Sequence, residues 1–247
     1  MRYLAEMTFV DVHEIAGDSV AILPIGAIEA HGPHLPLWAD VIIARGMALA
    51  GAQALEGWGI KSVVVAPPLQ FTSAGFAAGF AGTLSISPQT LTAVAVDAIA
   101  SLHRAGFARV AIANAHLDPG HVASVHEAVR ITGEKGGPAV VFPDITRKPW
   151  ALRLTDEFKS GACHAGRFET SIVMAERPDL VREATRLTLD PNPASLSQAI
   201  RAGTKTFEEA GGPAAYFGFP RDATAEEGRE VLRTLGAILA EAVIAQG

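Results

Sequence analysis

The sequence predicts an α/β protein built around a mostly parallel, wound β-sheet. Four short runs are almost continuously apolar and rich in Val and Ile, as expected of strands buried on both faces. These runs cover residues 19–25, 61–67, 108–114 and 138–144. Longer segments of helical periodicity separate them, and right-handed crossovers of this kind place helices on both faces of a sheet. Ligands of such sheets bind beyond the carboxyl ends of the strands.

The segments between the strands are long enough to form helices. The expected helices cover residues 41–55, 88–105, 121–132 and 225–246. Clusters of Gly and Pro at 71–82, 134–138 and 211–220 indicate loops. They are not expected to be domain linkers, because the strand pattern continues across the first two. No long internal repeat interrupts this pattern. We therefore expect a single domain over residues 1–247.

The composition argues against several classes of protein. The 247 residues include 20 Lys and Arg against 26 Asp and Glu, and the scattered basic residues offer no stripe to a nucleic-acid backbone. A single Cys cannot build a disulfide framework, and the first residues carry acids and His where a signal peptide needs an apolar core. The long uncharged stretch 62–96 is broken by Pro, Gly, Gln and Thr before it reaches the length of a membrane span. We expect a cytoplasmic protein with no nucleic-acid or membrane partner.

Ionisable side chains gather in an otherwise nearly uncharged stretch, "IGAIEAHGPHLPLWAD" at 25–40. Glu29 and His31 follow the first expected strand, and His116 and Asp118 follow the third. Residues i and i+2 of an extended chain point to the same side, so each pair can project into one cavity at the sheet edge. Carboxylate and imidazole ligands together suit Zn²⁺, Mn²⁺ or Fe²⁺, and one carboxylate can bridge two ions in a hydrolytic site.

Some of these residues also have a structural interpretation. Asp40 precedes a helical segment and Asp118 precedes Pro119, so each could be an N-cap that accepts the first N–H groups of a helix. His34 could make a structural hydrogen bond instead of ligating a metal. His121 falls in the first turn of the following helix. The histidines expected at the surface are His13, His103 and His126.

Several motifs resemble those of the creatininase (creatinine amidohydrolase) family. The segment "LPIGAIEAHGPHLPLWAD" at 23–40 is similar to the family signature Pro-x-Gly-x-x-Glu-x-His-Gly-x-His-Leu-Pro, which reaches an Asp nine residues after its first His. Further similar segments are "FAGTLSI" (80–86), "NAHLD" (114–118), "HAGRFETS" (164–171) and "YFGFPRDATAEEG" (216–228). They span nearly the whole chain. The resemblance implies the three-layer α/β sandwich of that family and a homo-oligomer, commonly a hexamer.

The resemblance also implies ligands for two divalent metal ions, which would be Zn, Mn or Fe. The implied ligands are Glu29, Asp40 and His116 for one ion, and His31, Asp40 and a further carboxylate for the other. Asp40 would therefore bridge the two ions. Asp118 is one candidate for the further carboxylate, because creatininase has an acidic residue at that position. Many relatives have Gly there, so Glu169 is the other candidate.

The implied reaction is hydrolysis of a C–N bond in a small-molecule amide, lactam or formamide. Two divalent ions lower the pKa of a water until hydroxide is available near neutral pH, so no protein nucleophile is needed. His164 would face the substrate as an acid, base or oxyanion partner. His164 directly, or Asp118 through a water, would protonate the departing nitrogen, and Glu169 would ligate a metal or orient the ligands.

Departures from the family pattern leave the substrate open. Ala77 stands where relatives often have His, Ala81 replaces a Pro, and Leu117 and Asp118 follow the histidine of the Asn-Gly-His loop. Trp150 is a candidate aromatic wall, but the Trp-Asp pair that creatininase has before its later histidine is missing. Creatininase activity itself is therefore not expected. Relatives in the family deformylate a pyrimidine intermediate, trim a peptide in redox-cofactor maturation or hydrolyse oxidised cyclitols.

Two other functions are alternatives. Cys163 beside His164 suggests a thiol nucleophile, but neighbouring residues on a helix point about 100° apart and cannot easily share a proton. A ligand-binding protein without catalysis is the second alternative, because Ala77 and Ala115 depart from the family pattern at the site. Metal content separates these functions, since a hydrolase of this kind needs about two ions per chain.

Overall fold

A computed structural model describes residues 1–246 and contains one five-stranded β-sheet in that part of the chain. The strands are β1 (Arg2–Tyr3), β2 (Ser19–Ile25), β3 (Ser62–Val65), β4 (Arg109–Asn114) and β5 (Ala139–Val141). All neighbouring pairs are parallel, and the strand order is β1-β3-β2-β4-β5. The four apolar runs therefore form β2 to β5. The edge strand β1 has two residues and is too short to leave an apolar run.

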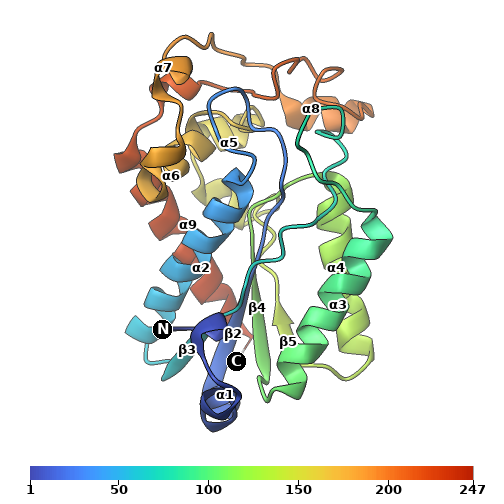
Figure 1. Ribbon diagram of the computed structural model, residues 1–247, viewed down its shortest axis with the longest axis vertical. Helices are drawn as coiled ribbons and strands as arrows, with labels where there is room; N and C mark the ends of the chain where they lie inside the picture. The colour runs from blue at the N-terminus through green and yellow to red at the C-terminus, as the bar shows by residue number, and fades with distance from the viewer. Residues whose placement is uncertain (247) are drawn as a thin grey trace.

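Helices cover both faces of the sheet and form a three-layer α/β sandwich, as expected (Figure 1). One face carries α2 (Ala39–Gly57), α6 (Arg167–Glu176) and α9 (Ala225–Ala245), which pack on one another. The other face carries α3 (Pro88–Arg104) and α4 (Pro119–Glu134). The shorter helices are α1 (Phe9–Ile15), α5 (Asp156–Ser160), α7 (Glu183–Arg186) and α8 (Leu196–Ala202). Single 3₁₀ turns cover Leu4–Glu6, Ala16–Asp18, Trp150–Arg153, Pro178–Leu180 and Pro220–Asp222.

Alternate residues of the central strands enter two separate cores. Ile22 of β2 packs in the core that α2, α6 and α9 cover. Leu23, the next residue, packs in the core that α3 and α4 cover, together with Ile99 and Val125. Both faces of β2 are buried, which is why its sequence is continuously apolar instead of alternating. Within residues 1–246, no helix is both long and apolar enough to cross a membrane.

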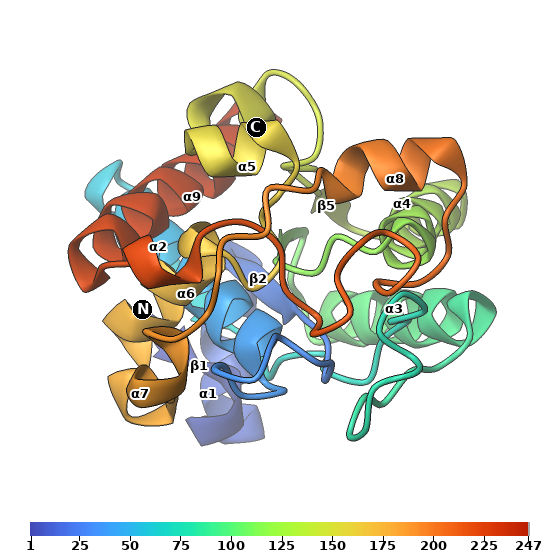
Figure 2. The same ribbon diagram turned by 90° about the horizontal axis from the view of Figure 1, so that it is seen from above.

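The strand order places a topological switch point at β2 and β4. The chain passes from β2 to β3 on one side of the sheet and then returns to β4 on the other side. The two strands end together, because Ile25 pairs with Asn114 and the Ala115 N–H donates to the Ile25 carbonyl at 3.1 Å. The view from above in Figure 2 looks onto this carboxyl edge, where loops from distant parts of the chain converge. Ligands of wound sheets bind at such a point.

Two helices begin earlier in the sequence than expected. Helix α2 begins at Ala39 with Trp38 as its N-cap, so Asp40 lies inside the first turn and the capping interpretation of Asp40 is wrong. Helix α4 begins at Pro119 with Asp118 as its N-cap, as the structural alternative for Asp118 proposed. An aspartate at the start of a helix thus has two different positions here: Asp118 is an N-cap, whereas Asp40 lies inside the first turn.

Candidate metal centre

Ionisable residues from four segments meet beyond the carboxyl ends of β2 and β4. Glu29 and His31 come from the loop after β2, Asp40 from the first turn of α2, His116 from the loop after β4 and Glu169 from the first turn of α6. Each is at most 4% exposed. Their nitrogen and oxygen atoms form three-residue groups in which all ligand atoms lie within 4.8 Å of one another. The groups are Glu29, Asp40 and His116; His31, Asp40 and Glu169; and Glu29, His31 and His164.

Asp40 is shared between two of these groups. Its Oδ2 lies 2.9 Å from Nδ1 of His116, and its Oδ1 lies 3.1 Å from Nε2 of His31. His116 Nδ1 is also 3.2 Å from Glu29 Oε1, and His31 Nε2 is 3.5 Å from Glu169 Oε2. One carboxylate therefore presents an oxygen to each of two imidazole–carboxylate pairs.

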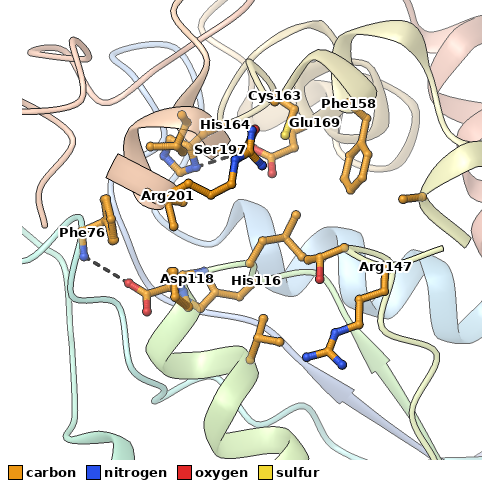
Figure 3. A pocket seen from close by; sticks show the side chains of 18 of the residues that line it. Phe76, His116, Asp118, Arg147, Phe158, Cys163, His164, Glu169, Ser197 and Arg201 are labelled. Atoms are coloured by element: carbon orange, nitrogen blue, oxygen red, sulfur yellow. Dashed lines mark hydrogen bonds and ion pairs between the residues drawn. The ribbon is translucent and has the colours of Figure 1, made fainter. Parts of the chain in front are cut away.

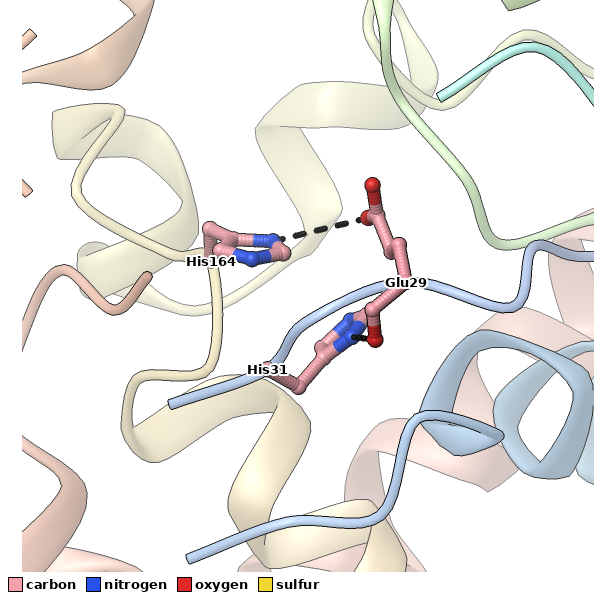
Figure 4. Close-up of side chains that lie close together, drawn as sticks. All are labelled: Glu29, His31 and His164. Atoms are coloured by element: carbon pink, nitrogen blue, oxygen red, sulfur yellow. Dashed lines mark hydrogen bonds and ion pairs between the residues drawn. The ribbon is translucent and has the colours of Figure 1, made fainter. Parts of the chain in front are cut away.

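A backbone carbonyl orients each of the three histidines in these groups. His31 Nδ1 lies 3.1 Å from the Glu29 carbonyl, and His116 Nε2 lies 2.9 Å from the Ser73 carbonyl. His164 Nε2 lies 3.0 Å from the Ala30 carbonyl, while its Nδ1 faces Glu29 at 3.9 Å (Figure 4). A carbonyl only accepts, so these outer nitrogens carry the protons and the inner nitrogens of the neutral rings carry lone pairs.

Lone pairs and carboxylates at these separations repel one another unless a cation lies among them. Glu29 Oε2 also has no hydrogen-bond partner within the described residues, although it is buried. Buried anionic oxygens without partners are costly, and a metal ion satisfies several of them at once. A set of two imidazoles and three carboxylates, each imidazole held by an outer hydrogen bond, therefore fits divalent metal ions.

The charges of the cluster shift its pKa values strongly. Burial raises the pKa of Asp40, but the charges of His31 and His116 outweigh it and hold that pKa below its usual range. Burial opposes protonation of His31, yet the Asp40 and Glu169 carboxylates raise its pKa to about 10. Burial, reinforced by the Asp40 carboxylate, raises the pKa of Glu169 to about 8. Without a metal, the cluster therefore holds protons near neutral pH.

Asp40 reaches the cluster because α2 begins very close to β2. A Cβ on Gly26, directly after β2, would lie 2.7 Å from the backbone carbon of Asp40 and 2.7 Å from the nitrogen of Val41. Only a residue without a side chain permits this approach. The glycine of the motif is thus explained by backbone packing that aims Asp40 at His31 and His116.

His116 is held by two residues that contribute no ligand atom. Asn114 donates its side-chain amide to the His116 carbonyl at 2.7 Å and contacts His121 Nε2 through its Oδ1 at 2.7 Å. The His121 ring lies edge-on to His116 with centroids 4.6 Å apart. His121 lies in the first turn of α4, as expected, but it is fully buried as a support of the loop after β4.

Glu169 is positioned by the turn that precedes α6. Its Oε2 accepts the Ala165 N–H at 2.6 Å, and Ala165 has a φ of 50°, a conformation that costs energy for a residue with a side chain. Glu157 of α5 fixes the same turn, because its carboxylate accepts the N–H groups of Arg167 at 2.9 Å and Phe168 at 2.6 Å. The sequence offered only an acidic residue in a helical segment and did not indicate this role for Glu157.

The sequence matches the family Creatininase (creatinine amidohydrolase) over residues 5–243. The creatinine amidohydrolase of Pseudomonas putida is 30% identical over 197 residues, which cover 72% of this chain and 73% of that one. The chain belongs to the creatininase family of hydrolases.

Another relative of this chain is named as a peptidase. The mycofactocin precursor peptide peptidase of Mycobacterium ulcerans (strain Agy99) is 31% identical over 219 residues, covering 85% of this chain and 78% of that one. A crystal structure of creatinine amidohydrolase (creatininase) aligns with a TM-score of 0.76 and 25% identity over 99% of this chain and 97% of that one. Similar creatininase structures include a Zn-Zn type mutant and a form described as creatininase Mn.

His164 lies between the ligand cluster of this creatininase-family chain and the cavity. Its ring stacks on Phe207 with centroids 4.2 Å apart and lies 4.4 Å from the ring of His31. Burial and the charge of His31 lower the pKa of His164 well below its usual value. The neutral ring therefore keeps its lone pair on Nδ1, toward the cluster. Phe207 was not singled out from the sequence, where it is one of several Phe residues in loop-like surroundings.

Asp118 lies outside the three ligand groups found among the described residues. Its Oδ1 accepts the N–H groups of Gly120 at 2.8 Å and His121 at 3.3 Å, and its Oδ2 accepts the Phe76 N–H at 3.2 Å. Both oxygens are therefore occupied by backbone donors. The carboxylate that stands beside His31 and Asp40 is that of Glu169.

Four further histidines lie outside the ligand groups. His34 Nε2 lies 2.9 Å from Thr170 Oγ1, so His34 makes the structural hydrogen bond proposed as its alternative. His13 and His103 are exposed, as expected. His126 is half-buried instead of fully at the surface, because its Nε2 pairs with Asp144 at 2.8 Å.

A cavity of about 780 Å³ opens onto the cluster (Figure 3). Glu29, Asp40, His116, His164 and Glu169 contribute to its floor, and Asp118 lies on its wall. Trp150 is not among the lining residues, so the aromatic wall expected there is wrong; the neighbouring Ala151 and Leu152 line the cavity instead. This volume lies within the range of sites for small organic ligands.

Cys163 also lines the cavity, next to His164. Burial, together with the Glu169 and Glu157 carboxylates, raises the pKa of its thiol well above the usual value. A nucleophilic cysteine needs the opposite shift, because the thiolate is the reactive form. The environment of Cys163 therefore disfavours the thiol mechanism.

Proposed function

We propose that this chain is an amidohydrolase that uses two divalent metal ions. The observation that carries the proposal is the sharing of Asp40 between two buried ligand groups, one with Glu29 and His116 and the other with His31 and Glu169. Asp40 would bridge the ions through its two oxygens. Glu169, whose Oε2 is close to His31, would complete the second group in preference to Asp118.

Two bound ions of this kind supply a water of lowered pKa and a Lewis acid for the scissile carbonyl. The protein contributes orientation, since backbone carbonyls fix the rings of His31 and His116 and the turn before α6 fixes Glu169. Phe76, Phe158 and Phe207 line the cavity above and limit the access of water.

His164 would move the proton that the reaction transfers. Its Nε2 is engaged by the Ala30 carbonyl at 3.0 Å, so Nδ1 is the nitrogen available to a substrate. Nδ1 faces the carboxylates of Glu29 at 3.9 Å and Glu169 at 4.0 Å. Burial and the charge of His31 lower the pKa of the ring well below its usual value, so a proton taken up there would be delivered readily to the departing nitrogen.

The bond attacked is a C–N amide bond, and both small amides and short peptides are candidate substrates. A small molecule is supported by the likeness to creatinine amidohydrolase. A peptide is supported by the likeness to a precursor peptide peptidase. The same chemistry serves both substrates, so the cavity and not the metal centre would select between them.

Metal analysis and an activity screen test the proposal together. We expect about two equivalents of Zn or Mn per chain, and metal-dependent hydrolysis within a panel of lactams, formamides, ureas and short peptides. The blank is Glu29→Gln, which removes a ligand charge and should lower turnover by more than the roughly 10–100-fold seen for partners that only orient ligands. A folded protein that binds no metal would instead support a binding protein without catalysis.

A cysteine variant provides the control for the thiol alternative. Cys163→Ala should retain both metal content and turnover, because the thiol is protonated and no step uses it. Loss of turnover in this variant with both metals still bound would revive the thiol mechanism.

A further inference from the structure

The mouth of the cavity is cationic although the protein as a whole is acidic. The chain has a formal net charge of −6. The basic residues that line the cavity are Arg147, Lys148, Lys159 and Arg201. They come from the segment after β5, from α5 and from α8. Figure 2 shows α5 and α8 as separate elements, and Figure 3 shows Arg147 and Arg201 apart from each other.

Two of these four basic residues are already paired within the protein. Arg147 Nε lies 3.0 Å from Asp144 Oδ2, and Lys159 Nζ lies 2.8 Å from Asp156 Oδ1. Among residues 1–246, no carboxylate lies within 4.0 Å of the charged groups of Lys148 or Arg201. The Asp118 carboxylate on the cavity wall is occupied by backbone N–H groups. Lys148 and Arg201, hereafter the mouth cations, therefore retain their positive charge for a ligand.

The walls between the mouth cations and the metal-ligand cluster are mostly apolar. Leu117, Val122 and Ala151 line the cavity, as do Phe158 of α5 and Leu196 and Ile200 of α8. Such a surface binds an aliphatic or aromatic group and provides few partners for a polar group in the middle of the ligand. A ligand complementary to the cavity has a hydrolysable bond at one end, an apolar middle and an anion at the other.

The charge of the mouth favours the same kind of ligand. Three carboxylates and one hydroxide would balance the charge of two divalent ions at the floor, so the attraction for an anion comes from the mouth cations. A cleft lined by one sign of charge raises the local concentration of oppositely charged ligands. A neutral amide would bind at the metal-ligand cluster but would gain nothing from the mouth cations.

We infer that the substrate is an amide whose departing amine carries a free carboxylate, as in an N-acyl amino acid or a peptide cut near its C-terminus. This inference rests on the proposed function, because it places the scissile bond at the metal-ligand cluster. The carboxylate pairs with one of the mouth cations, Arg201 or Lys148, and the side chain of the departing residue packs on the apolar wall. Hydrolysis adds one water across the C–N bond, giving an acid and an amino acid whose nitrogen takes the proton.

Matched ligands with and without the carboxylate test the inference. N-acetylleucine is compared with N-isopentylacetamide, which lacks only the carboxylate, and N-acetylalanylleucine is compared with N-acetylalanine isopentylamide. The two pairs distinguish an amino-acid derivative from a peptide. We expect the carboxylate to improve both calorimetric affinity and kcat/KM by about tenfold or more, as a charge-assisted contact does. The preference should weaken at high ionic strength.

Variants assign the preference to the mouth cations. Arg201→Gln and Lys148→Gln should each reduce the ratio between the two ligands, and the double variant should bring it near one. Arg201→Lys should restore part of it. The control is Arg233→Gln, which removes an exposed positive charge on α9 outside the residues that line the cavity and should keep the wild-type ratio.

Binding to metal-free protein keeps the inference separate from the proposed function. A carboxylate preference that persists without metal, and is lost in the double variant, supports the mouth cations even if no amide is hydrolysed. Equal binding and equal turnover of both members of each pair would overturn the inference while leaving the amidohydrolase intact. A preference that the double variant retains would overturn the inference as well, because residues other than the mouth cations would then bind the carboxylate.

Discussion

Asp118 and Glu169 show how one position in the cluster is decided at the level of single residues. Both are acidic, both lie at the start of a helix, and both were candidates for the same metal site. The structure gives Asp118 three backbone donors at the start of α4. It gives Glu169 a place within 3.5 Å of His31. The difference is that Asp118 is an N-cap, outside its helix, whereas Glu169 is inside the first turn and can project away from it.

Substitutions of these two acids should affect different properties: metal content for Glu169 and folding stability for Asp118. Glu169→Gln should lose about one of two metal equivalents, because amide oxygen is a weaker ligand than carboxylate. Asp118→Ala should keep both metals but lower the free energy of unfolding by about 1 kcal/mol through loss of the cap. Elemental analysis and urea unfolding measure the two effects. If Asp118→Ala instead lost one metal and Glu169→Gln kept both, the ligand assignment would have to be reversed.

Metal binding should release protons, with a pH dependence that follows from the cluster. The carboxylates beside His31 raise its pKa to about 10, and burial raises the pKa of Glu169 to about 8. Both groups therefore hold protons at neutral pH in the metal-free protein, and a metal must displace them. Apparent Zn²⁺ affinity should rise from about pH 6 to about pH 8. Calorimetry in buffers of different ionisation enthalpy counts the protons released, and a pH-independent affinity would contradict this account.

The junction between β2 and α2 matters at the scale of elements. The strand ends at Ile25 and the helix begins at Ala39, so the motif residues lie between two elements whose backbones nearly touch at Gly26. The loop between them carries Glu29 and His31, and the helix carries Asp40. Three ligands thus depend on one backbone approach that no side chain interrupts.

Gly26→Ala should disturb this junction. The new Cβ would lie 2.7 Å from the backbone of Asp40 and Val41, so α2 must shift and Asp40 with it. We expect a loss of about 1–3 kcal/mol in stability, as for other overpacked sites, and weaker metal binding. The control is Gly57→Ala at the end of the same helix, where a Cβ meets nothing within 4 Å. Unfolding and metal titration should leave the control unchanged or slightly more stable; similar losses in both variants would point to a general effect on α2.

At the scale of the whole molecule, the cluster is a buried concentration of charge that joins the edge of the sheet to the helical layer of α2 and α6. Its residues come from the loops after β2 and β4 and from α2 and α6. Buried carboxylates without sufficient partners destabilise the metal-free fold. Metal ions that bind only the folded state would offset this cost and tie these elements together.

Removal of metal should therefore lower thermal stability. At a free metal concentration about a hundredfold above Kd, one bound ion stabilises the fold by roughly 2.7 kcal/mol. For a chain of this size, that corresponds to a loss of about 5–10 °C in Tm on chelation. Calorimetric scans before and after chelation, and after addition of Zn²⁺ or Mn²⁺, measure the change. An unchanged Tm in protein shown to lose its metal would mean that the cluster is not coupled to folding.

The sequence by itself determined the chain order of β2 to β5 with the helices α2, α3, α4 and α9, and the chemical character of the site. Strands β2 to β5 were visible because burial on both faces makes a strand continuously apolar, and the motif residues were visible because charge is rare around them. The family motifs also implied Asp40 as the shared carboxylate. These are local properties, and each can be recognised within a short segment.

Only the tertiary structure decided which distant residues meet. His164 contacts the carbonyl of Ala30 across 134 positions in the chain, and His34 contacts Thr170 across 136. The stacking of Phe207 on His164 and the absence of Trp150 from the cavity are likewise consequences of how loops pack at the switch point. Periodicity reports how deeply a residue is buried but not which residue lies opposite. That choice depends on the packing of whole elements, which no single segment encodes.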